Sequence, residues 1–353
     1  MRPEIDPGTP FTNDVIIVDG MWGTGKSILS SLIGSLEGVE KKRIDYLFEY
    51  LCVGYSLGRI SADLAMTLIR IQADLDQYNN LIGREVNLRP SDDSGFRNTP
   101  GSFRYLRRLI ASEGEEVVDR INDENLALLL VTHHISAVCT PLVNALSGRL
   151  FLIEVVRHPL QLVKYWTRYF EDFERSREFT LSAYIDGTRV PWFALDWHDE
   201  FIGLSPIDRA IRCINQMQIA AFSPPALKRD SLPEITHDTH RLIVPFESLI
   251  AQPNLVLNDV MSFTGRARTS RTNRVFNKQK IPRIASQTGR ATNIRSWLPS
   301  SALSYDEQLA ELMTWITQHA KPASIETMEA SIQEYELACT PVGDSTCLYL
   351  PFE

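Results

Sequence analysis

Four short runs of consecutive apolar residues, rich in β-branched side chains, stand out along the chain. They cover residues 15–18, 126–131, 150–156 and 242–244. Runs of this kind are typical of strands that are buried on both faces of a parallel sheet. After the first run and after the third, apolar residues recur at helical spacing, at positions 28, 29, 32, 33 and 36 and at 160, 163, 166 and 170. The alternation of strand and helix predicts a doubly wound α/β sheet with helices on both faces.

Two further stretches extend this plan. Residues 304–337 have the pattern of two amphipathic helices. We expect them in a C-terminal helical addition, about residues 301–353, to a single domain whose core spans about residues 12–300. Residues 85–101 are rich in Pro, Asp, Ser and Gly and predict a long loop, a kind of segment that often serves as a lid or a substrate wall.

The composition narrows the class of protein. The 353 residues carry 36 basic and 44 acidic side chains, a net charge of −8, which argues against nucleic-acid binding by the surface as a whole. No apolar run has the length of a membrane-spanning helix, and residues 1–10 lack the apolar centre of a secretion signal. The scattered cysteines indicate neither a disulfide framework nor a zinc site. We therefore expect a cytoplasmic protein without a membrane segment or a bound metal.

The sharpest motif is GMWGTGKS at residues 20–27, which matches G-x-x-x-x-G-K-[ST], the Walker A or P-loop pattern. It lies between the first predicted strand and its helix, where backbone N–H groups and the helix N-terminus cradle phosphate. Gly23, Thr24, Gly25, Lys26 and Ser27 are therefore candidate nucleotide ligands, with Lys26 on the terminal phosphate-like group and Ser27 on a magnesium ion if one is bound. A glycine-rich turn without a ligand is the alternative. The motif predicts a fold of the P-loop nucleoside-triphosphatase type.

Two more candidate residues follow predicted strands. His133 comes after the run at 126–131, and Arg157 comes after the run at 150–156. In open α/β sheets ligands bind at the carboxyl ends of the strands. An arginine there suits bidentate phosphate binding, and a histidine that is neutral at pH 7 suits a general base. An arginine paired with an acid and a hydrogen-bonded core histidine are the structural alternatives.

A basic segment lies between Val260 and Tyr305. This window has no acidic residue, whereas arginine or lysine stands at positions 266, 268, 271, 274, 278, 280, 283, 290 and 295. Apolar residues are interleaved with these charges, which favours an ordered anion-binding loop over a disordered nucleic-acid arm. A solvated basic face is the remaining interpretation.

In order along the chain, these motifs resemble the P-loop sulfotransferase family. Residues 150–170 are similar to the family's strand, R-x-P and helix, and LVTHHI at 130–135 resembles its strand-ending T-H. Residues 242–265 resemble its later strand-and-helix run, in which Glu247 matches a structural glutamate. GRATNIRSWLP at 289–299 resembles its late basic loop.

The resemblance implies sulfuryl transfer from 3′-phosphoadenosine 5′-phosphosulfate to a hydroxyl or amine of a small molecule or carbohydrate. By the same resemblance, residues 23–27 hold the 5′-phosphosulfate, with Lys26 acting on the transferred group. Arg157, Tyr165 and Arg290 hold the 3′-phosphate, and His133 is the catalytic base. Tyr165 stands where the family has a serine, and the family's loop reads K-S-G-T-T rather than G-T-G-K-S.

The Lys26-Ser27 pair also resembles the loop of small-molecule kinases, so an ATP- and magnesium-dependent kinase is a second hypothesis. It would need a carboxylate for the metal, Asp19 or Glu154, because residues 126–134 offer none. A nucleotide-binding regulatory protein without turnover is the third. We expect the acceptor pocket in the loops at 85–101 and 179–203. The aromatic stretch 191–201 within the second loop suits either a pocket wall or a core lid.

Overall fold

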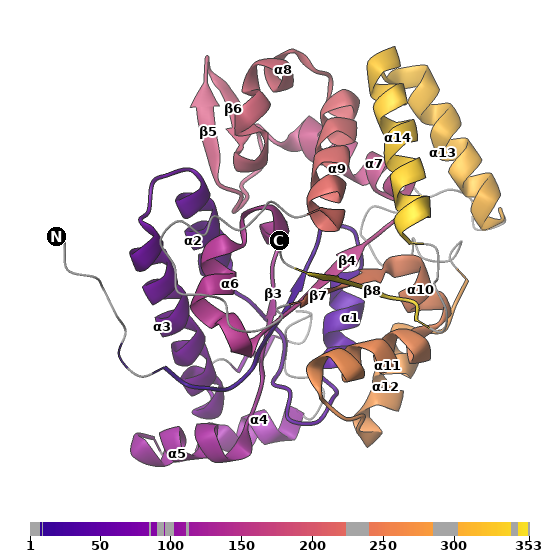
Figure 1. Cartoon of the computed structure of the whole chain (residues 1–353). Helices are drawn as coiled ribbons and strands as arrows, with labels where there is room; N and C mark the ends of the chain where they lie inside the picture. Colours follow the sequence, from indigo (N-terminus) through magenta and orange to yellow (C-terminus); the bar gives the residue numbers. More distant parts are fainter. Residues whose placement is uncertain are drawn as a thin grey trace.

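A six-stranded sheet forms the centre of the computed structural model, which describes residues 8, 10–84, 86–89, 95, 102–110, 113–223, 240–284, 303–339 and 345–351 (Figure 1). The strand order is β2-β3-β1-β4-β7-β8. The first five strands of this order run parallel, and β8 runs antiparallel to β7. The strands are β1 (Val15–Asp19), β2 (Arg43–Ile44), β3 (Leu128–Val131), β4 (Leu150–Val156), β7 (His240–Pro245) and β8 (Leu348–Pro351).

All four strands predicted from the apolar runs are confirmed as β1, β3, β4 and β7. Every residue of β1 and β3 is buried, as expected for strands covered on both faces. In the parallel pairing, Val18 of β1 lies opposite Val131 of β3 and Ile153 of β4. The three strands therefore end at one edge of the sheet, which collects the residues that follow them.

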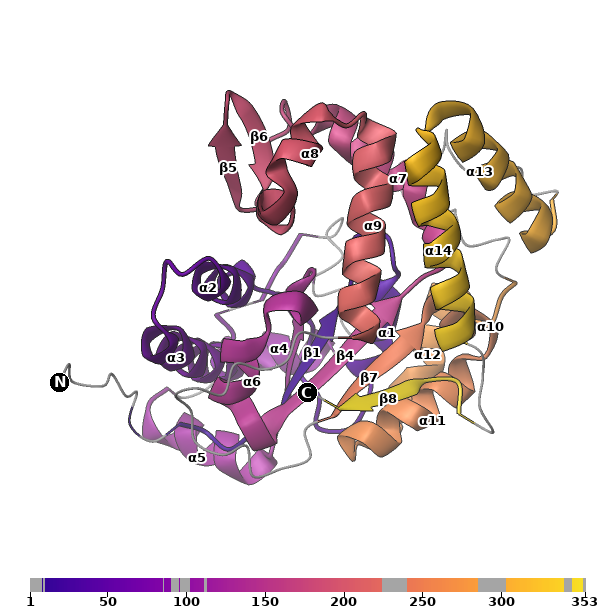
Figure 2. The ribbon, with the colours of Figure 1, turned by 45° about the horizontal axis from the view of Figure 1, so that its top comes forward.

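Helices cover both faces of the sheet, so the doubly wound prediction is confirmed (Figure 2). One face carries α1 (Lys26–Ile33), α10 (Phe246–Ala251), α11 (Pro253–Thr264) and α12 (Ser270–Gln279). The other carries α2 (Tyr46–Ser56), α3 (Ala62–Leu81) and α6 (Thr140–Leu146). Two further helices, α4 (Ser102–Arg108) and α5 (Glu115–Glu124), follow α3 in the chain, and α5 packs against the end of α3.

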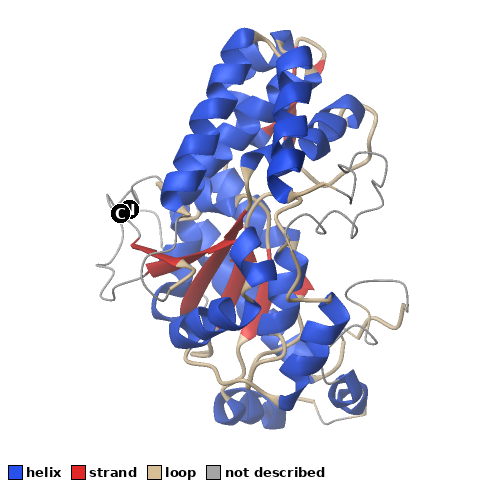
Figure 3. Cartoon of the chain, turned by 90° about the vertical axis from the view of Figure 1, so that its right-hand side faces the viewer, coloured by secondary structure: helices blue, strands red, loops and turns tan. Residues whose placement is uncertain are grey.

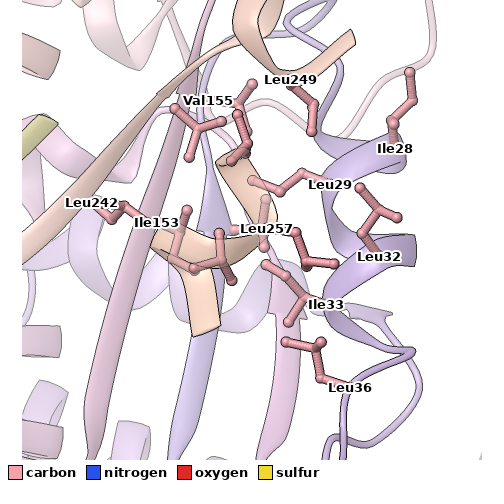
Figure 4. Close-up of a cluster of buried hydrophobic side chains, with 14 of the residues drawn as sticks. Ile28, Leu29, Leu32, Ile33, Leu36, Ile153, Val155, Leu242, Leu249 and Leu257 are labelled. Carbon is pink, nitrogen blue, oxygen red and sulfur yellow. The ribbon is translucent and has the colours of Figure 1, made fainter. Parts of the chain in front are cut away.

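The periodic apolar positions after β1 form the helix face that meets the sheet. Figure 4 shows Leu29 and Ile33 pointing from α1 toward Ile153 of β4 and Leu257 of α11. All five residues at these positions belong to one buried cluster with residues of β4, β7, α10 and α11: Ile28, Leu29, Leu32, Ile33 and Leu36. Each is at most 6% exposed. Burial of such side chains contributes about 1.5–3 kcal/mol each, so this face anchors the start of α1, and with it the loop before it, against the sheet.

A second helical layer lies beyond the carboxyl edge of the sheet (Figure 3). It consists of α7 (Pro159–Asp172), α9 (Pro206–Phe222), α13 (Tyr305–His319) and α14 (Pro322–Ala338), which pack around buried Trp166. The two C-terminal helices predicted for 304–337 are confirmed as α13 and α14, and they contact α7 and α9.

Several elements escaped the sequence analysis. The hairpin β5 (Ser182–Ile185) and β6 (Thr188–Pro191) is followed by a 3₁₀ helix, Trp192–Trp197, and by α8 (His198–Gly203). The edge strand β8 was missed because four residues carry too little periodicity to be recognised. Most of the predicted loop at 85–101 lies outside the described residues, and the described positions 86–89 and 95 belong to no helix or strand.

Two glycines of the loop after β1 are required by close packing. Gly20 (φ +135°) and Gly25 (φ +95°) both lie in the left-handed region of φ. A Cβ on Gly20 would lie 2.4 Å from the carbonyl oxygen of Val155, and one on Gly25 would lie 2.3 Å from the ring of Phe246. The loop therefore keeps its shape only with glycine at both positions.

Gly25→Ala should destabilise the fold by about 2–5 kcal/mol, because it adds a clash with Phe246 to the cost of a positive φ. Gly265→Ala is the matched control: Gly265 has φ +66° and no heavy atom within 4 Å of an added Cβ, so we expect a loss of only about 1–2 kcal/mol. Urea unfolding of both variants measures the difference. Equal losses would contradict the packing argument.

Candidate functional site

The glycine-rich loop joins β1 to α1 and holds its lysine inward. The ammonium of Lys26 donates hydrogen bonds to the carbonyl oxygens of Gly20 and Met21, the second at 3.0 Å. Burial lowers the pKa of Lys26 to about 8, against the opposing charges of Asp19, Glu49 and Glu154. A cation held by two neutral carbonyls in a buried loop is a group that a bound anion would stabilise.

The hydroxyl groups of the other predicted loop ligands, Thr24 and Ser27, differ in their exposure and in their hydrogen bonds. The hydroxyl of Thr24 is buried and donates to the carbonyl of Met21 at 2.9 Å, so it supports the loop itself. Ser27 lies exposed in the first turn of α1. Backbone N–H groups at the start of α1 carry about half a unit of positive charge in total, which suits an anion at the loop.

Arg157 and Tyr165 both lie against Gly23 in this loop. The guanidinium of Arg157 donates to the carbonyl of Gly23 at 2.8 Å and lies 4.6 Å from the ring centre of Phe246. A Cβ built on Gly23 would come within 3.8 Å of the ring of Tyr165. Burial raises the pKa of Tyr165, so its hydroxyl keeps its proton and remains a donor. The structure thus places two predicted anion ligands side by side with the loop.

A second arginine lies near Arg157. Burial lowers the pKa of Arg157, opposed by Glu247, and the positive charge of Arg283 lowers it further. The backbone N–H of Arg283 donates to the carbonyl of Ile250 at 2.8 Å, which fixes Arg283 at the end of α10. Arg290, predicted as the third ligand, lies outside the described residues.

The described part of the basic segment is ordered. Residues 270–279 form α12, which buries Val275 and Phe276 against the core. Arg266 pairs with Asp14, and the guanidinium of Arg268 donates to Asn254 at 3.1 Å. Arg266 and Arg268 therefore interact with other residues of the fold. Among the described residues of this segment, Arg283 is the one whose charge lowers the pKa of Arg157.

His133 forms a dyad with Glu49 of α2, a residue that sequence reasoning missed. The Oε1 atom of Glu49 accepts the backbone N–H of His133 at 3.0 Å and lies 2.9 Å from Nδ1 of its ring. Because Oε1 already accepts one N–H, we assign the proton of the second contact to Nδ1, which leaves the lone pair on Nε2. This is the tautomer that a general base at Nε2 requires.

The environment of the dyad keeps the ring neutral. Burial and the charge of Lys26 lower the pKa of His133 to about 2. Burial, followed by the charge of Asp19, raises the pKa of Glu49 to about 9. The charge of Lys26 lowers the pKa of His133 and opposes the rise in the pKa of Glu49, so the loop lysine lies close enough to interact electrostatically with both members of the dyad.

The carboxylates proposed as magnesium ligands are engaged within the protein. Both oxygens of buried Asp19 accept hydrogen bonds, one from the hydroxyl of Thr132 at 2.9 Å and the other from the backbone N–H of Ser136 at 3.2 Å. The Oε2 atom of Glu154 accepts from Ser136 at 2.6 Å and from Arg241 at 3.3 Å. Burial and Asp19 raise the pKa of Glu154 to about 7. This arrangement supports the strand ends and leaves little of either carboxylate for a metal.

Glu247 has the structural role that the sequence indicated. It accepts hydrogen bonds from the hydroxyls of Tyr305 at 3.1 Å and Tyr335 at 2.5 Å, and from the backbone N–H of His158 at 3.3 Å. These bonds join the start of α10 to α13, α14 and the turn after β4. The C-terminal helices thereby help to hold the segment that carries Arg157.

A pocket with aromatic walls opens beside the dyad. Its lining comes from the loop after β1, from α2, from the end of β3 and from the segment around β5 and β6. The lining residues are Trp22, Tyr46, Glu49, Tyr50, Val53, His133, His134, Phe179, Thr180, Leu181 and Trp192. The aromatic stretch 191–201 serves partly as a pocket wall and partly as core. Trp192 lines the pocket, whereas Phe193 and Phe201 are buried in the hydrophobic core.

No family model matches the chain, and no curated protein is detectably similar to it in sequence. Among solved structures, it is similar to the sulfotransferase domain of the Synechococcus PCC 7002 olefin synthase, with 13% identity and a TM-score of 0.43, over 97% of this chain and 100% of that one. It is also similar to the sulfotransferase domain from the curacin biosynthetic pathway, with 11% identity and a TM-score of 0.40, over 92% of this chain and 99% of that one.

A sulfotransferase from Alicyclobacillus acidocaldarius is similar with 11% identity and a TM-score of 0.33, over 91% of this chain and 96% of that one. In the described residues, no helix combines the length and apolar character needed to cross a bilayer.

Arg241→Met should destabilise the protein by about 3–5 kcal/mol at pH 8, because it leaves the buried Glu154 carboxylate without its cation. The loss should shrink below pH 7. The raised pKa of Glu154 means that the folded state binds a proton more readily than the unfolded state, so lowering the pH neutralises the carboxyl and relieves the penalty.

Urea unfolding at pH 8 and pH 5.5 measures this effect. Adding Glu154→Gln to Arg241→Met is the control and should remove most of the pH dependence. A loss of stability that is the same at both pH values would show that Arg241 acts through packing alone.

Proposed function

We propose that the protein is a sulfotransferase-like enzyme that moves a sulfuryl group from 3′-phosphoadenosine 5′-phosphosulfate to a hydroxyl or amine acceptor. The observation that carries the proposal is the juxtaposition, at one sheet edge, of a phosphate-type loop with Lys26, an arginine at its rim and the His133–Glu49 dyad. Sulfuryl transfer needs these parts: cations for the developing negative charge and a base for the acceptor proton.

The residues present fit a donor with two anionic ends. The loop residues 23–27 and Lys26 would hold the 5′-phosphosulfate. Arg157 and Tyr165, both against Gly23, would hold the 3′-phosphate, together with Arg283 or with the predicted ligand Arg290. In an acidic protein this group of cations favours binding of a multiply charged anion over a neutral one.

In the proposed reaction the acceptor oxygen bonds to sulfur while the bond from sulfur to the bridging phosphate oxygen breaks, which leaves adenosine 3′,5′-bisphosphate. The Nε2 atom of His133 takes the proton of the acceptor hydroxyl. Glu49 holds the ring in the required tautomer and stabilises the imidazolium that forms. Lys26 stabilises the negative charge that builds on the bridging oxygen.

The engagement of Asp19 and Glu154 favours this reaction over the kinase hypothesis. Both carboxylates are at most 5% exposed and accept hydrogen bonds from Thr132, Ser136 and Arg241. Phosphoryl transfer with the Walker A loop uses magnesium held in part by a carboxylate at a strand end. Sulfuryl transfer makes no such demand on these two residues.

Calorimetric titration tests the donor. We expect adenosine 3′,5′-bisphosphate to bind at least about tenfold, or about 1.4 kcal/mol, more tightly than adenosine 5′-monophosphate or ADP with magnesium. Arg157→Ala should abolish most of the preference for the bisphosphate over the monophosphate, because it removes a cation for the 3′-phosphate. Arg274→Ala removes an exposed arginine of α12 in the basic segment; it is the control and should keep this preference. Tighter binding of ADP with magnesium would favour the kinase.

The rate of transfer against pH tests the base. Because the pKa of His133 is lowered to about 2, protonation of its ring causes no loss of rate between pH 9 and pH 5.5, and a fall in rate over this range comes from Glu49. Because the pKa of Glu49 is raised to about 9, the rate should rise toward pH 9 as the carboxylate forms and stabilises the imidazolium.

Glu49→Gln should flatten this alkaline rise, and His133→Ala should lower the rate by about 10²–10⁴-fold at every pH. Both variants should bind adenosine 3′,5′-bisphosphate as the wild type does, which is the control for folding. Full activity of His133→Ala would refute its role as the base.

A further inference from the structure

The pocket beside the dyad is walled by one face of α2. Tyr46, Glu49, Tyr50 and Val53 are three or four residues apart, so they point from the same side of this helix. Glu49 reaches His133 from this face, and the rings around it line the approach to the dyad. A molecule that delivers a hydroxyl to His133 must therefore pass along this face.

Aromatic rings of the pocket contact one another, one pair stacked and two pairs tilted by 34° and 35°. The Tyr46 ring stacks on the His133 ring with centres 5.8 Å apart and an interplanar angle of 10°. The Tyr46 and Phe179 rings are 5.2 Å apart, and Trp22 of the nucleotide loop lies 5.5 Å from His133. A pocket lined by aromatic rings favours a flat, apolar ligand that can pack against them.

The walls carry no permanent charge. Neither lysine, arginine nor aspartate lines this pocket. Its ionisable groups are held in their neutral forms by burial, which raises the pKa values of Tyr46 and Tyr50 as well as that of Glu49 and lowers those of both histidines. A charged ligand would lose its hydration here without gaining a counter-ion.

One polar group of the pocket lacks a partner. His134 is 6% exposed, and neither of its ring nitrogens has a hydrogen-bond partner in the described residues. Trp22 meets this ring edge-on with centres 4.7 Å apart. A buried polar side chain without a partner costs free energy that a polar atom of a ligand can recover.

Phe179 forms the solvent-facing wall of the pocket, and its exposed side chain is the part of the lining that is free to move. The space left between the lining side chains is only about 10 Å³, close to the room that one water molecule needs. Phe179 is 67% exposed, and its carbonyl accepts the hydroxyl of Tyr50 at 2.8 Å. Entry of a ligand therefore requires Phe179 and the loop around it to move outward from α2.

We propose that this pocket receives the acceptor and that the acceptor is uncharged, with its reactive hydroxyl on or next to a flat, apolar ring. The proposal rests on the proposed function for the identity of the group transferred. The selection against charged acceptors rests on the pocket walls alone. Tyr46 and Phe179 are its specificity-determining residues.

A series of para-substituted phenols of similar size tests the inference. 4-Ethylphenol is uncharged, 4-hydroxyphenylacetate is an anion, and tyramine is a cation at pH 7. With radiolabelled 3′-phosphoadenosine 5′-phosphosulfate, we expect kcat/KM for 4-ethylphenol to exceed that for each charged compound by at least about tenfold. A preference for either charged phenol, or for uncharged glucose over 4-ethylphenol, would overturn the inference.

Binding is measured separately by ligand-observed NMR, with no donor present. Phe179→Ala and Tyr46→Ala should weaken the saturation-transfer signal of 4-ethylphenol, whereas Tyr184→Ala should not, because Tyr184 is 76% exposed and does not line the pocket. Retention of the full signal in both pocket variants would overturn the inference.

The two proposals fail in different ways. If adenosine 3′,5′-bisphosphate binds but 4-ethylphenol is neither bound nor sulfated, the inference about the acceptor is wrong and the donor assignment stands. If 4-ethylphenol binds in the pocket but the bisphosphate does not bind the loop, the proposed function is wrong while the chemistry of the pocket is supported.

Discussion

The parallel pairing of β1 with β3 on one side and β4 on the other is the constraint on which the site depends. Val18 lies opposite both Val131 and Ile153, so the three strands run in register toward the same edge of the sheet, and β4 extends two residues beyond β1. The residues that follow them then meet at this edge: the glycine-rich loop after β1, His133 after β3 and Arg157 after β4. A shift of one residue in either pairing would turn every side chain of that strand to the opposite face and separate these groups.

Burial controls the electrostatics of this edge. Lys26, Asp19 and Glu154 lie within the same poorly solvated region, and each alters the pKa of another. Ser136 connects the two carboxyls, because its backbone N–H donates to Asp19 and its hydroxyl donates to Glu154, and Arg241 supplies a cation from β7. The carboxyl groups of Asp19 and Glu154 thereby offset the positive charges of Lys26 and Arg241 inside the fold. Lys26 is the cation of this region that contacts the loop, and the ring of His133 is held neutral.

The aromatic residues link the two halves of the proposed site. Trp22 belongs to the nucleotide loop, yet its ring contacts His133 and His134 at the end of β3 and Trp166 of α7. The indole N–H of Trp166 donates to the carbonyl of Trp22 at 3.3 Å. The ring of Trp22 therefore separates the loop that would hold the donor from the pocket that would hold the acceptor. This ring is held in place by packing against its neighbours.

The sequence by itself determined the four buried strands, the helix after the nucleotide loop, the two C-terminal helices and the candidates Lys26, His133 and Arg157. These features depend on local patterns: apolar runs, helical spacing and a motif that is continuous in the chain. Only the tertiary structure decided which carboxylate orients His133, since Glu49 lies 84 residues away in sequence. It also decided that Asp19 and Glu154 are engaged with Ser136 and Arg241, and that Tyr46, Phe179 and Trp192 share one pocket. These contacts form between segments that are far apart in the chain, and no local periodicity records which distant side chain will meet which.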